Sequence, residues 1–454
     1  MSDLSVAHRA ALAQLIENVP DRTLRQLALA VAGMPGDKAR SLESMLAQAA
    51  IDRARRAEAL TAIAPMFRPR PDGVAATTFP APVLARLWKA ASANQADILA
   101  YLDPDEYGEH DAYRVAAVCT RLYAAGAAAV RDQAEAVWPA GLASADRDTG
   151  LTALARVCDL GGLVHRALPS LKAWTGRPDG DQIAELRLLL RDAAAISPDG
   201  AQELLDILFA HLDDAPLILR LVTHSSSAAG RDSFLSGSEL AVFVDRLIDA
   251  AEHRARSVET WQPGQPVEAL QQSLTWIASF LTESDATVQI HPETAWGKRI
   301  RHVRLGASKT VGALLGRVQR AVTPALPMAK AQTAGRMTRE MPQLDVPLDP
   351  STTTAALDAL DLVRILRAPA SVFGCEAQRS GLMADLTTQV FNYADLALEE
   401  INGGQVADEA LAIARVELAT NFLDRLETVD QARTMRRRVA VAGHGPQAHS
   451  PRAA

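Results

Sequence analysis

Apolar residues recur every three or four positions along most of this chain, which is the spacing that one face of an α-helix requires. After Asp37, for example, Leu42, Met45, Leu46 and Ala49 follow this spacing, and arginines gather on the opposite face. The pattern continues to about residue 63, so it predicts a long helix there. It recurs after residue 83 with few interruptions, which predicts a chain built almost entirely from helices.

Short breaks rich in proline and glycine separate the predicted helices, as at Ser197-Pro198, where serine is expected to cap a helix and proline to take its first position. Short connections between helices of this length predict antiparallel neighbours, in a bundle or an α-solenoid. Tryptophan, proline and glycine do not recur at a fixed interval, so we predict an irregular multi-helical array. The predicted helices of this part are 83–101, 111–138, 147–174, 180–196, 200–223, 237–256 and 266–283.

Two proline-rich intervals, 65–82 and 323–350, divide the predicted helices into units, because repeated prolines interrupt helices. The C-terminal unit contains three predicted helices, enough for a small helical bundle, and the last residues show no pattern and are expected to be disordered. The predicted divisions are an N-terminal helical unit 1–64, a main helical body 83–322 that includes a basic segment 294–322, a linker 323–350, a C-terminal unit 351–442 and a tail 443–454.

Composition strengthens the all-α prediction. Alanine supplies much of the 48% hydrophobic content and only 4% of residues are aromatic, whereas strands favour branched and aromatic side chains. The apolar content excludes a disordered chain, and three cysteines exclude a disulfide scaffold. We see no stretch long enough for a transmembrane helix and no secretory signal, so we expect a cytoplasmic protein.

Charge is distributed unevenly along the chain. The segment from Thr294 to Arg339 contains ten lysines and arginines and no acidic residue, so it carries +10 and leaves −17 on the rest of a chain whose total is −7. Within it, Ser308 is expected to cap a helix that reaches about Val322, with Val311, Leu314 and neighbouring apolar residues on one face. A basic amphipathic helix of this kind is able to bind an anionic membrane surface or nucleic acid.

Three interpretations of this basic segment stay open from the sequence. The segment packs against acidic residues of the same chain or of another copy, it binds an anionic protein partner, or residues 298–339 bind a membrane surface or nucleic acid. The second and third interpretations make these side chains candidate binding residues: Lys298, Arg299, Arg301, Arg304, Lys309, Arg317 and Arg320. They require the cations to be exposed together, and pairing with internal carboxylates would favour the first interpretation.

The acidic segment 103–111 is the densest group of metal-ligating residue types, and Glu106, His110 and Asp111 would be its ligands or catalytic groups. Pro104 and Gly108 favour a loop that caps a helix, and the spacing matches no metal-binding motif. We therefore predict no metal site and no cofactor.

The three cysteines are isolated in apolar surroundings, so Cys119 and Cys158 are predicted to be buried and inert, while Cys375 lies at an expected helix start. Motifs of phosphate-binding loops and of hydrolase nucleophiles do not occur. The sequence therefore favours a non-catalytic interaction or scaffold protein with an unidentified protein partner. The alternatives are a peripheral factor that binds an anionic surface through 298–339, and an all-α enzyme with a dispersed site near 103–111.

Overall fold

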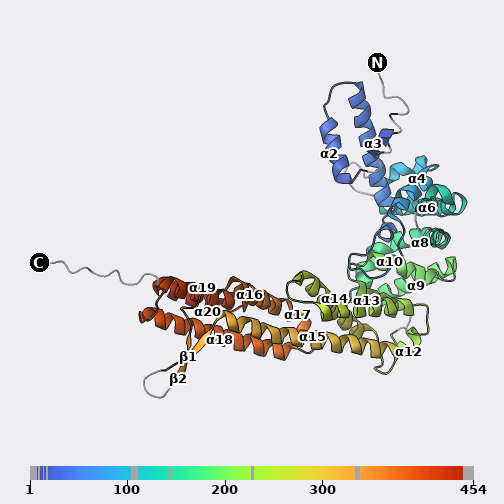
Figure 1. The fold of residues 1–454 in the computed structure, drawn as a ribbon. Helices are drawn as coiled ribbons and strands as arrows, with labels where there is room; N and C mark the ends of the chain where they lie inside the picture. The colour runs from blue at the N-terminus through green and yellow to red at the C-terminus, as the bar shows by residue number, and fades with distance from the viewer. Residues whose placement is uncertain are drawn as a thin grey trace. The chain divides into compact units, whose positions relative to one another are not determined.

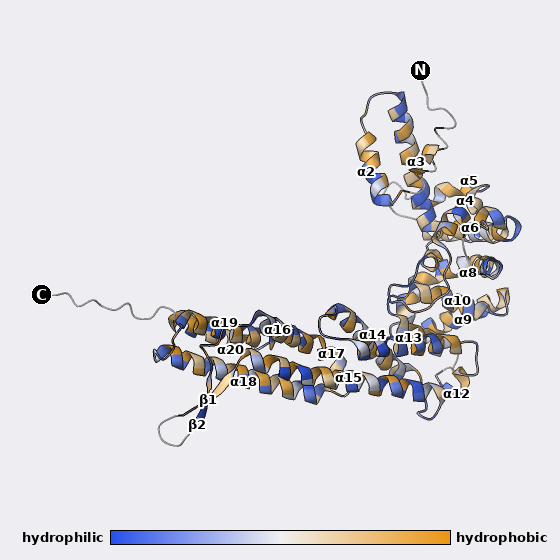
Figure 2. Cartoon of the chain, in the orientation of Figure 1, coloured by the Kyte–Doolittle hydropathy of each residue, from blue (hydrophilic) through white to orange (hydrophobic). Residues whose placement is uncertain are grey.

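The computed structural model describes residues 8, 11–13, 15–16, 19–103, 111–142, 146–225, 230–332 and 338–442. Within these residues the chain is helical apart from one two-stranded sheet, which confirms the predicted all-α, multi-helical array (Figure 1). The predicted tail 443–454 lies outside the described residues. Figure 2 shows that hydrophobic and hydrophilic residues alternate around the helices, as the sequence pattern predicts.

The helices belong to two compact units, one formed by 1–247 with 287–289 and the other by 248–286 with 290–454. The division falls inside a helix, α13 (Ala241–Thr260), rather than in a proline-rich interval. Residues 83–322, which the sequence treats as one body, therefore contribute to both units.

The first unit is a succession of helices joined by short connections. Its α-helices are α2 (Asp21–Val31), α3 (Asp37–Ala59), α4 (Ala81–Ser92), α5 (Ala96–Leu99), α6 (Ala112–Asp132), α7 (Ala134–Val137), α8 (Arg147–Trp174), α9 (Gly180–Ile196), α10 (Gly200–His211), α11 (Ile218–Ser225) and α12 (Asp232–Leu235), with 3₁₀ turns at Ala64–Phe67, Ala100–Leu102 and Ala215–Leu217. Aspartate side chains cap several of them, as Asp146 and Asp179 do for α8 and α9.

Gly161 and Gly162 lie inside α8, which continues across them without a break. A Cβ atom at Gly161 would lie 2.4 Å from the ring of Tyr123, so the glycine provides the space in which α6 packs against α8. The cost of glycine in a helix is offset here by a tertiary contact that the local pattern cannot reveal.

The second unit contains α14 (Val267–Thr287), α15 (Ala295–Ala325), the hairpin β1 (Met328–Gln332) and β2 (Thr338–Pro342), and the helices α16 (Pro350–Ile365), α17 (Arg367–Val372), α18 (Glu376–Asn402), α19 (Glu409–Arg425) and α20 (Val429–Ala442). Helix α15 packs against α16 and α18, and α18 packs against α19 and α20, which forms the C-terminal helical bundle. Buried leucines, valines and alanines fill the interior of this bundle.

The basic segment forms one helix of 31 residues, about 46 Å long. It begins at Ala295, where the Thr294 hydroxyl accepts a hydrogen bond from Gly297 N at 3.2 Å. The prediction that Ser308 caps the helix is therefore wrong: Ser308 lies in its interior. Buried residues recur from Trp296 to Val322, and their packing stabilises α15 as one continuous helix on both sides of Ser308.

The proline-containing interval 323–350 is more ordered than the sequence suggests. Pro324 lies in the last turn of α15, and β1 pairs with β2 in antiparallel register, with Lys330 opposite Glu340. Alanine, lysine and glutamate have little preference for strands, so pairing between the two segments, rather than local propensity, stabilises this hairpin.

Candidate functional site

The arginines in the first half of α15 are paired with carboxylates of the same unit. The Arg299 guanidinium donates to both carboxylate oxygens of Glu252, at 2.8 and 3.0 Å, and also to Asp249. Arg304 donates to Asp285 at 2.7 and 2.8 Å, and Arg301 pairs at 3.2 Å with Glu293, the residue immediately before the helix cap Thr294. The positive charge of this half is therefore largely balanced within the chain.

The pair formed by Arg299 and Glu252 is the strongest of these contacts. Hydrogen bonds from Arg299 lower the pKa of Glu252, and the same carboxylates raise the pKa of Arg299. A two-pronged contact of a half-buried guanidinium with a carboxylate has a defined geometry, which makes it structural rather than an open binding group.

The cations in the second half of α15 have a different environment. Lys309, Arg317 and Arg320 are exposed, and none of them forms an ion pair with any residue that the structure describes. Arg320 donates a hydrogen bond to the backbone oxygen of Gly316, at 3.2 Å. Lys298, near the start of the helix, is likewise exposed and has no carboxylate partner in the described part of the chain.

A groove with a volume of 950 Å³ lies beside this second half, within the second unit. Three elements form it: α15, α16 and the loop between α13 and α14. Leu314 and Val318 of α15 and Leu362 of α16 supply buried apolar side chains to its floor, and small residues of the two helices, Ala321 and Ala355 among them, leave room above that floor.

The loop that ends the groove has a conformation fixed by its sequence. Gln265 N donates to Gln262 O at 3.1 Å across a turn whose central residues are Pro263 and Gly264. Gly264 has a φ of 94°, which glycine adopts without strain, and proline favours the preceding position of such a turn. The indole of Trp261 donates to the backbone oxygen of Pro266 at 3.4 Å, so the turn positions a half-buried tryptophan against the groove.

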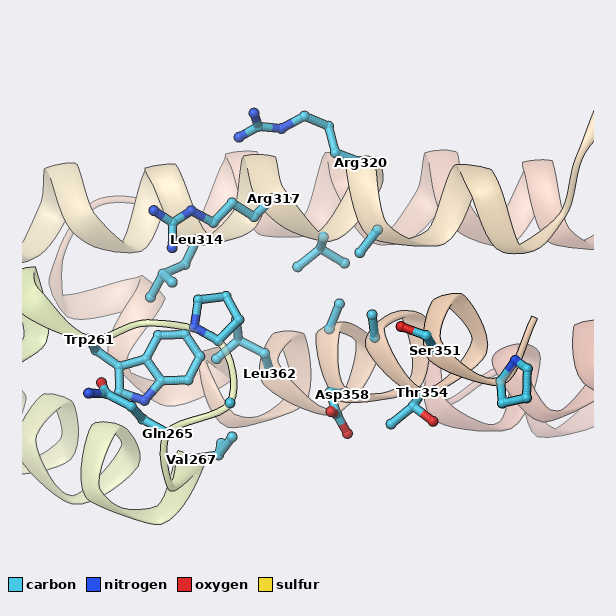
Figure 3. Close-up of a pocket in the computed structure, with 17 residues that line it drawn as sticks. Trp261, Gln265, Val267, Leu314, Arg317, Arg320, Ser351, Thr354, Asp358 and Leu362 are labelled. Carbon is cyan, nitrogen blue, oxygen red and sulfur yellow. The ribbon is translucent and has the colours of Figure 1, made fainter.

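The two edges of the groove differ in charge (Figure 3). Arg317 and Arg320 extend from the outer edge of α15, whereas Thr354 and Asp358 project from the far edge of α16. Leu314 points into the space above Trp261, between these edges. The groove is therefore an apolar surface between two polar edges. The edge on α15 is basic, and the edge on α16 carries a hydroxyl group and a single carboxylate.

A neighbouring cavity of 1130 Å³ has a more polar lining, in which opposite charges already compensate one another. Arg379 pairs with Glu376 at 3.0 Å, and Asp361 pairs with Arg364 at 3.7 Å and with Arg425 at 3.3 Å. Five of its seven charged side chains form ion pairs within the chain, and the remaining two, Glu268 and Asp358, are both acidic.

The candidate residues of the acidic segment 103–111 are described only in part. Glu106 and His110 lie outside the described residues, and Asp111 caps α6 by accepting hydrogen bonds from Tyr113 N and Arg114 N. Within the described ranges, no three histidine, cysteine or acidic side chains are grouped closely enough to hold a metal ion.

The three cysteines are buried. Desolvation is the main cause that raises the pKa of Cys119 and of Cys158 to about 12, so both remain thiols at neutral pH. Cys375 is the cap residue of α18, and its Sγ lies 3.5 Å from the backbone oxygen of Ser308 on α15. The expectation of buried cysteines at positions 119 and 158 is confirmed.

Sequence reasoning identified the basic residues of the groove and missed its apolar part. Trp261, Val318 and Leu362 come from three elements that are far apart in the chain. The one local signal is Trp261 immediately before Gln262-Pro-Gly-Gln-Pro266, where a half-exposed aromatic residue precedes a rigid turn.

Comparisons with known proteins add no further information about this site. The chain matches no protein-family model, no curated protein and no solved structure. Among the described helices, none has the length and apolar character that crossing a membrane requires.

Proposed function

We propose that this protein is a non-catalytic helical interaction or scaffold protein of the cytoplasm, and that the groove beside α15 binds a segment of a partner polypeptide. The observation that supports the proposal most directly is the open apolar groove, which carries a half-buried tryptophan at one end. Tryptophan and arginine are the residues that most often dominate the binding energy of protein interfaces.

The chemistry of the lining favours binding over catalysis. Asp358 is the one carboxylate among the residues that line the groove, and the lining includes neither histidine nor cysteine. General acid–base catalysis normally uses two titratable groups that face a common substrate atom. The groove therefore has apolar area that a partner polypeptide could cover, but it has only one carboxylate with which to act on a substrate.

The dimensions suit a helix or an extended peptide. From Pro350 to Leu362, α16 borders the groove over about 18 Å, or roughly three helical turns. Amphipathic helices commonly bind in such grooves by placing their apolar face between two helices. The alanines on the facing helices allow close approach of a partner backbone.

A second candidate function, binding of an anionic surface, is supported by a different observation. Lys298, Lys309 and Arg320 are spaced eleven residues apart, which is close to three turns, so these exposed cations follow one face of α15. This second function is less well supported, because Arg299, Arg301 and Arg304 form ion pairs with carboxylates of the same chain. We therefore favour the polypeptide partner.

A peptide-display selection tests the proposal with two variants. Ala355 lines the groove and is exposed, so Ala355→Trp fills the groove without entering the core, while Ala313→Trp makes the same change at an exposed position of α15 that does not line the groove. We expect peptides selected on the wild-type protein to bind Ala313→Trp equally well and to lose about tenfold or more of their affinity for Ala355→Trp. Equal binding to both variants, or the failure of the selection to enrich any peptide, would contradict the proposal.

A further inference from the structure

Arg317 and Arg320 differ from most arginines of the second unit because no carboxylate among the described residues pairs with them. Most arginines on the other helices of the unit form ion pairs, for example Arg379 with Glu376 at 3.0 Å and Arg438 with Asp395 at 2.5 Å. In a chain with a net charge of −7, carboxylates are abundant, yet the described residues bring none to these two positions. Two adjacent arginines therefore remain available at one edge of the groove.

The spacing of these arginines suits a helical partner. Residues three apart on a helix lie on neighbouring turns, about 4.5 Å apart along the axis. A second helix lying beside α15 presents its own side chains with the same periodicity, so two carboxylates three or four residues apart are able to meet Arg317 and Arg320 together. Guanidinium groups bind carboxylates with two parallel hydrogen bonds, which adds directional preference to the attraction.

The opposite edge sets a limit on the charge of the partner. Asp358 forms no ion pair with any described residue, and Thr354 lies one turn before it on the same edge of α16. A partner that is acidic all round would place negative charge against Asp358, which is unfavourable in a partly desolvated groove. The carboxylates of a fitting partner must therefore lie on the side that faces α15.

We propose that the groove selects an acidic amphipathic helix, with an apolar face on Trp261, Ala321 and Ala355 and with carboxylates along the edge that meets Arg317 and Arg320. This inference rests on the proposed function, since it names the class of polypeptide that the same groove binds. The apolar contacts supply most of the affinity, and the charged edge supplies orientation and discrimination between partners.

The concave shape distinguishes this partner from a membrane or a nucleic acid. A lipid surface is flat on this scale, so it would contact exposed cations along α15 and leave the groove floor uncovered. A phosphate backbone would contact the row formed by Lys298, Lys309 and Arg320, and it has no apolar face to place on Trp261. Arg320 belongs to both surfaces, so Arg317 at the groove and the lysines outside it separate the two kinds of partner.

Fluorescence anisotropy with two designed peptides tests the inference. Both peptides are amphipathic helices of about 16 residues with the same leucine and alanine face, and the edge that meets α15 carries glutamate in one and glutamine in the other. We expect the glutamate peptide to bind the wild-type protein about tenfold more tightly at low salt, and this advantage to shrink as salt is raised.

Two double variants of the full chain locate the effect. Arg317→Glu with Arg320→Glu reverses the groove edge, and Lys298→Glu with Lys309→Glu makes the same change in charge at exposed positions of the same helix outside the groove. We expect the first variant to lose the preference for glutamate and the second to retain most of it. Circular dichroism of both variants establishes that they are folded, since all four side chains are exposed.

The outcomes separate this inference from the function on which it rests. If the two peptides bind with equal affinity and Ala355→Trp abolishes both, the groove binds polypeptides and the acidic preference is overturned. If neither peptide binds, both the preference and the designed partner class are overturned. If the Lys298 and Lys309 variant loses as much affinity as the Arg317 and Arg320 variant, or if only anionic lipid vesicles and duplex DNA bind, the exposed face of α15 is the binding surface and the inference is wrong.

Discussion

The two halves of α15 carry the same kind of residue and use it in opposite ways. In the first half, Arg299 and Arg304 meet acidic side chains of α13 and α14. In the second half, Arg317 and Arg320 border an apolar groove and meet no carboxylate in the described part of the chain. The cations of α15 therefore do not form one basic surface, because carboxylates pair with three arginines of its first half, whereas Arg317 and Arg320 of its second half have no such partner among the described residues.

This difference explains why net charge alone is a poor guide to binding. An arginine paired within the chain contributes to folding, and releasing it to bind a partner would cost the energy of the internal contact. An arginine without an internal partner, beside an apolar groove, binds a ligand without first breaking an internal contact. The four following predictions probe the two halves in order of decreasing effect on stability.

The largest effect is expected at the start of the first half, where Gly297→Ala would place a Cβ atom 2.2 Å from the backbone oxygen of His291 and 2.9 Å from Cα of Pro292. Backbone atoms cannot move aside as a flexible side chain does, so the helix start must shift. We expect the free energy of unfolding to fall by about 2–3 kcal/mol in urea denaturation. A loss no larger than that of an ordinary surface substitution would show that this end of α15 is loosely packed.

Next in size is the loss of the paired arginine. Arg299→Ala leaves Glu252 and Asp249 without their partner, and because the site is half-buried we expect a loss of about 1–2 kcal/mol. Arg317→Ala is the matched control in the second half, and we expect it to change stability by less than about 0.5 kcal/mol. Equal losses in chemical denaturation would remove the distinction between the halves.

Low pH is expected to reduce the stabilisation that the pair of Arg299 and Glu252 gives to the folded protein. Its pKa is lowered in the folded protein, chiefly by hydrogen bonds from Arg299, so this carboxylate stabilises the fold above its unfolded pKa of about 4.3. That contribution is lost as pH falls through the lower folded pKa. The stability difference between the wild type and Arg299→Ala should therefore be full at pH 6 to 7 and shrink toward pH 3; a difference that stays constant with pH would exclude Glu252 as the relevant partner.

The smallest effect is a gain in the second half. Gly316 is exposed, and a Cβ atom there would have no neighbour within 4 Å. Alanine at this position therefore raises the helix propensity without a steric clash. We expect Gly316→Ala to stabilise the protein by about 0.5–1 kcal/mol. A thermal melt that shows destabilisation would mean that this face of α15 is covered in solution.

The sequence predicted the helices whose ends are marked by local signals. The bounds 147–174 and 180–196 coincide with α8 and α9, because Asp146 and Asp179 cap them and proline or glycine follows their ends. The hairpin of β1 and β2 was not predictable in the same way, since its residues favour strands only once the two segments are paired.

The candidate site was predictable only in part, for a similar reason. The arginines were visible as a run of charge without acids, but their partners lie far away in the chain, as Glu252 does from Arg299, 47 residues apart. The groove floor joins Leu314 with Leu362 and a turn after Trp261, and no local pattern links these residues. Which cations are neutralised and which border a groove is a property of tertiary packing.

The most direct test of the central claim is a charge exchange between the groove and its ligand. The measurement is the dissociation constant of the variant Arg317→Glu with Arg320→Glu for two designed peptides of the same apolar face, one with glutamate and one with lysine on the edge that meets α15. We predict that the wild type prefers the glutamate peptide, and that the variant prefers the lysine peptide by about tenfold. If the wild type and the variant rank the two peptides in the same order, the second half of α15 does not select a partner by charge.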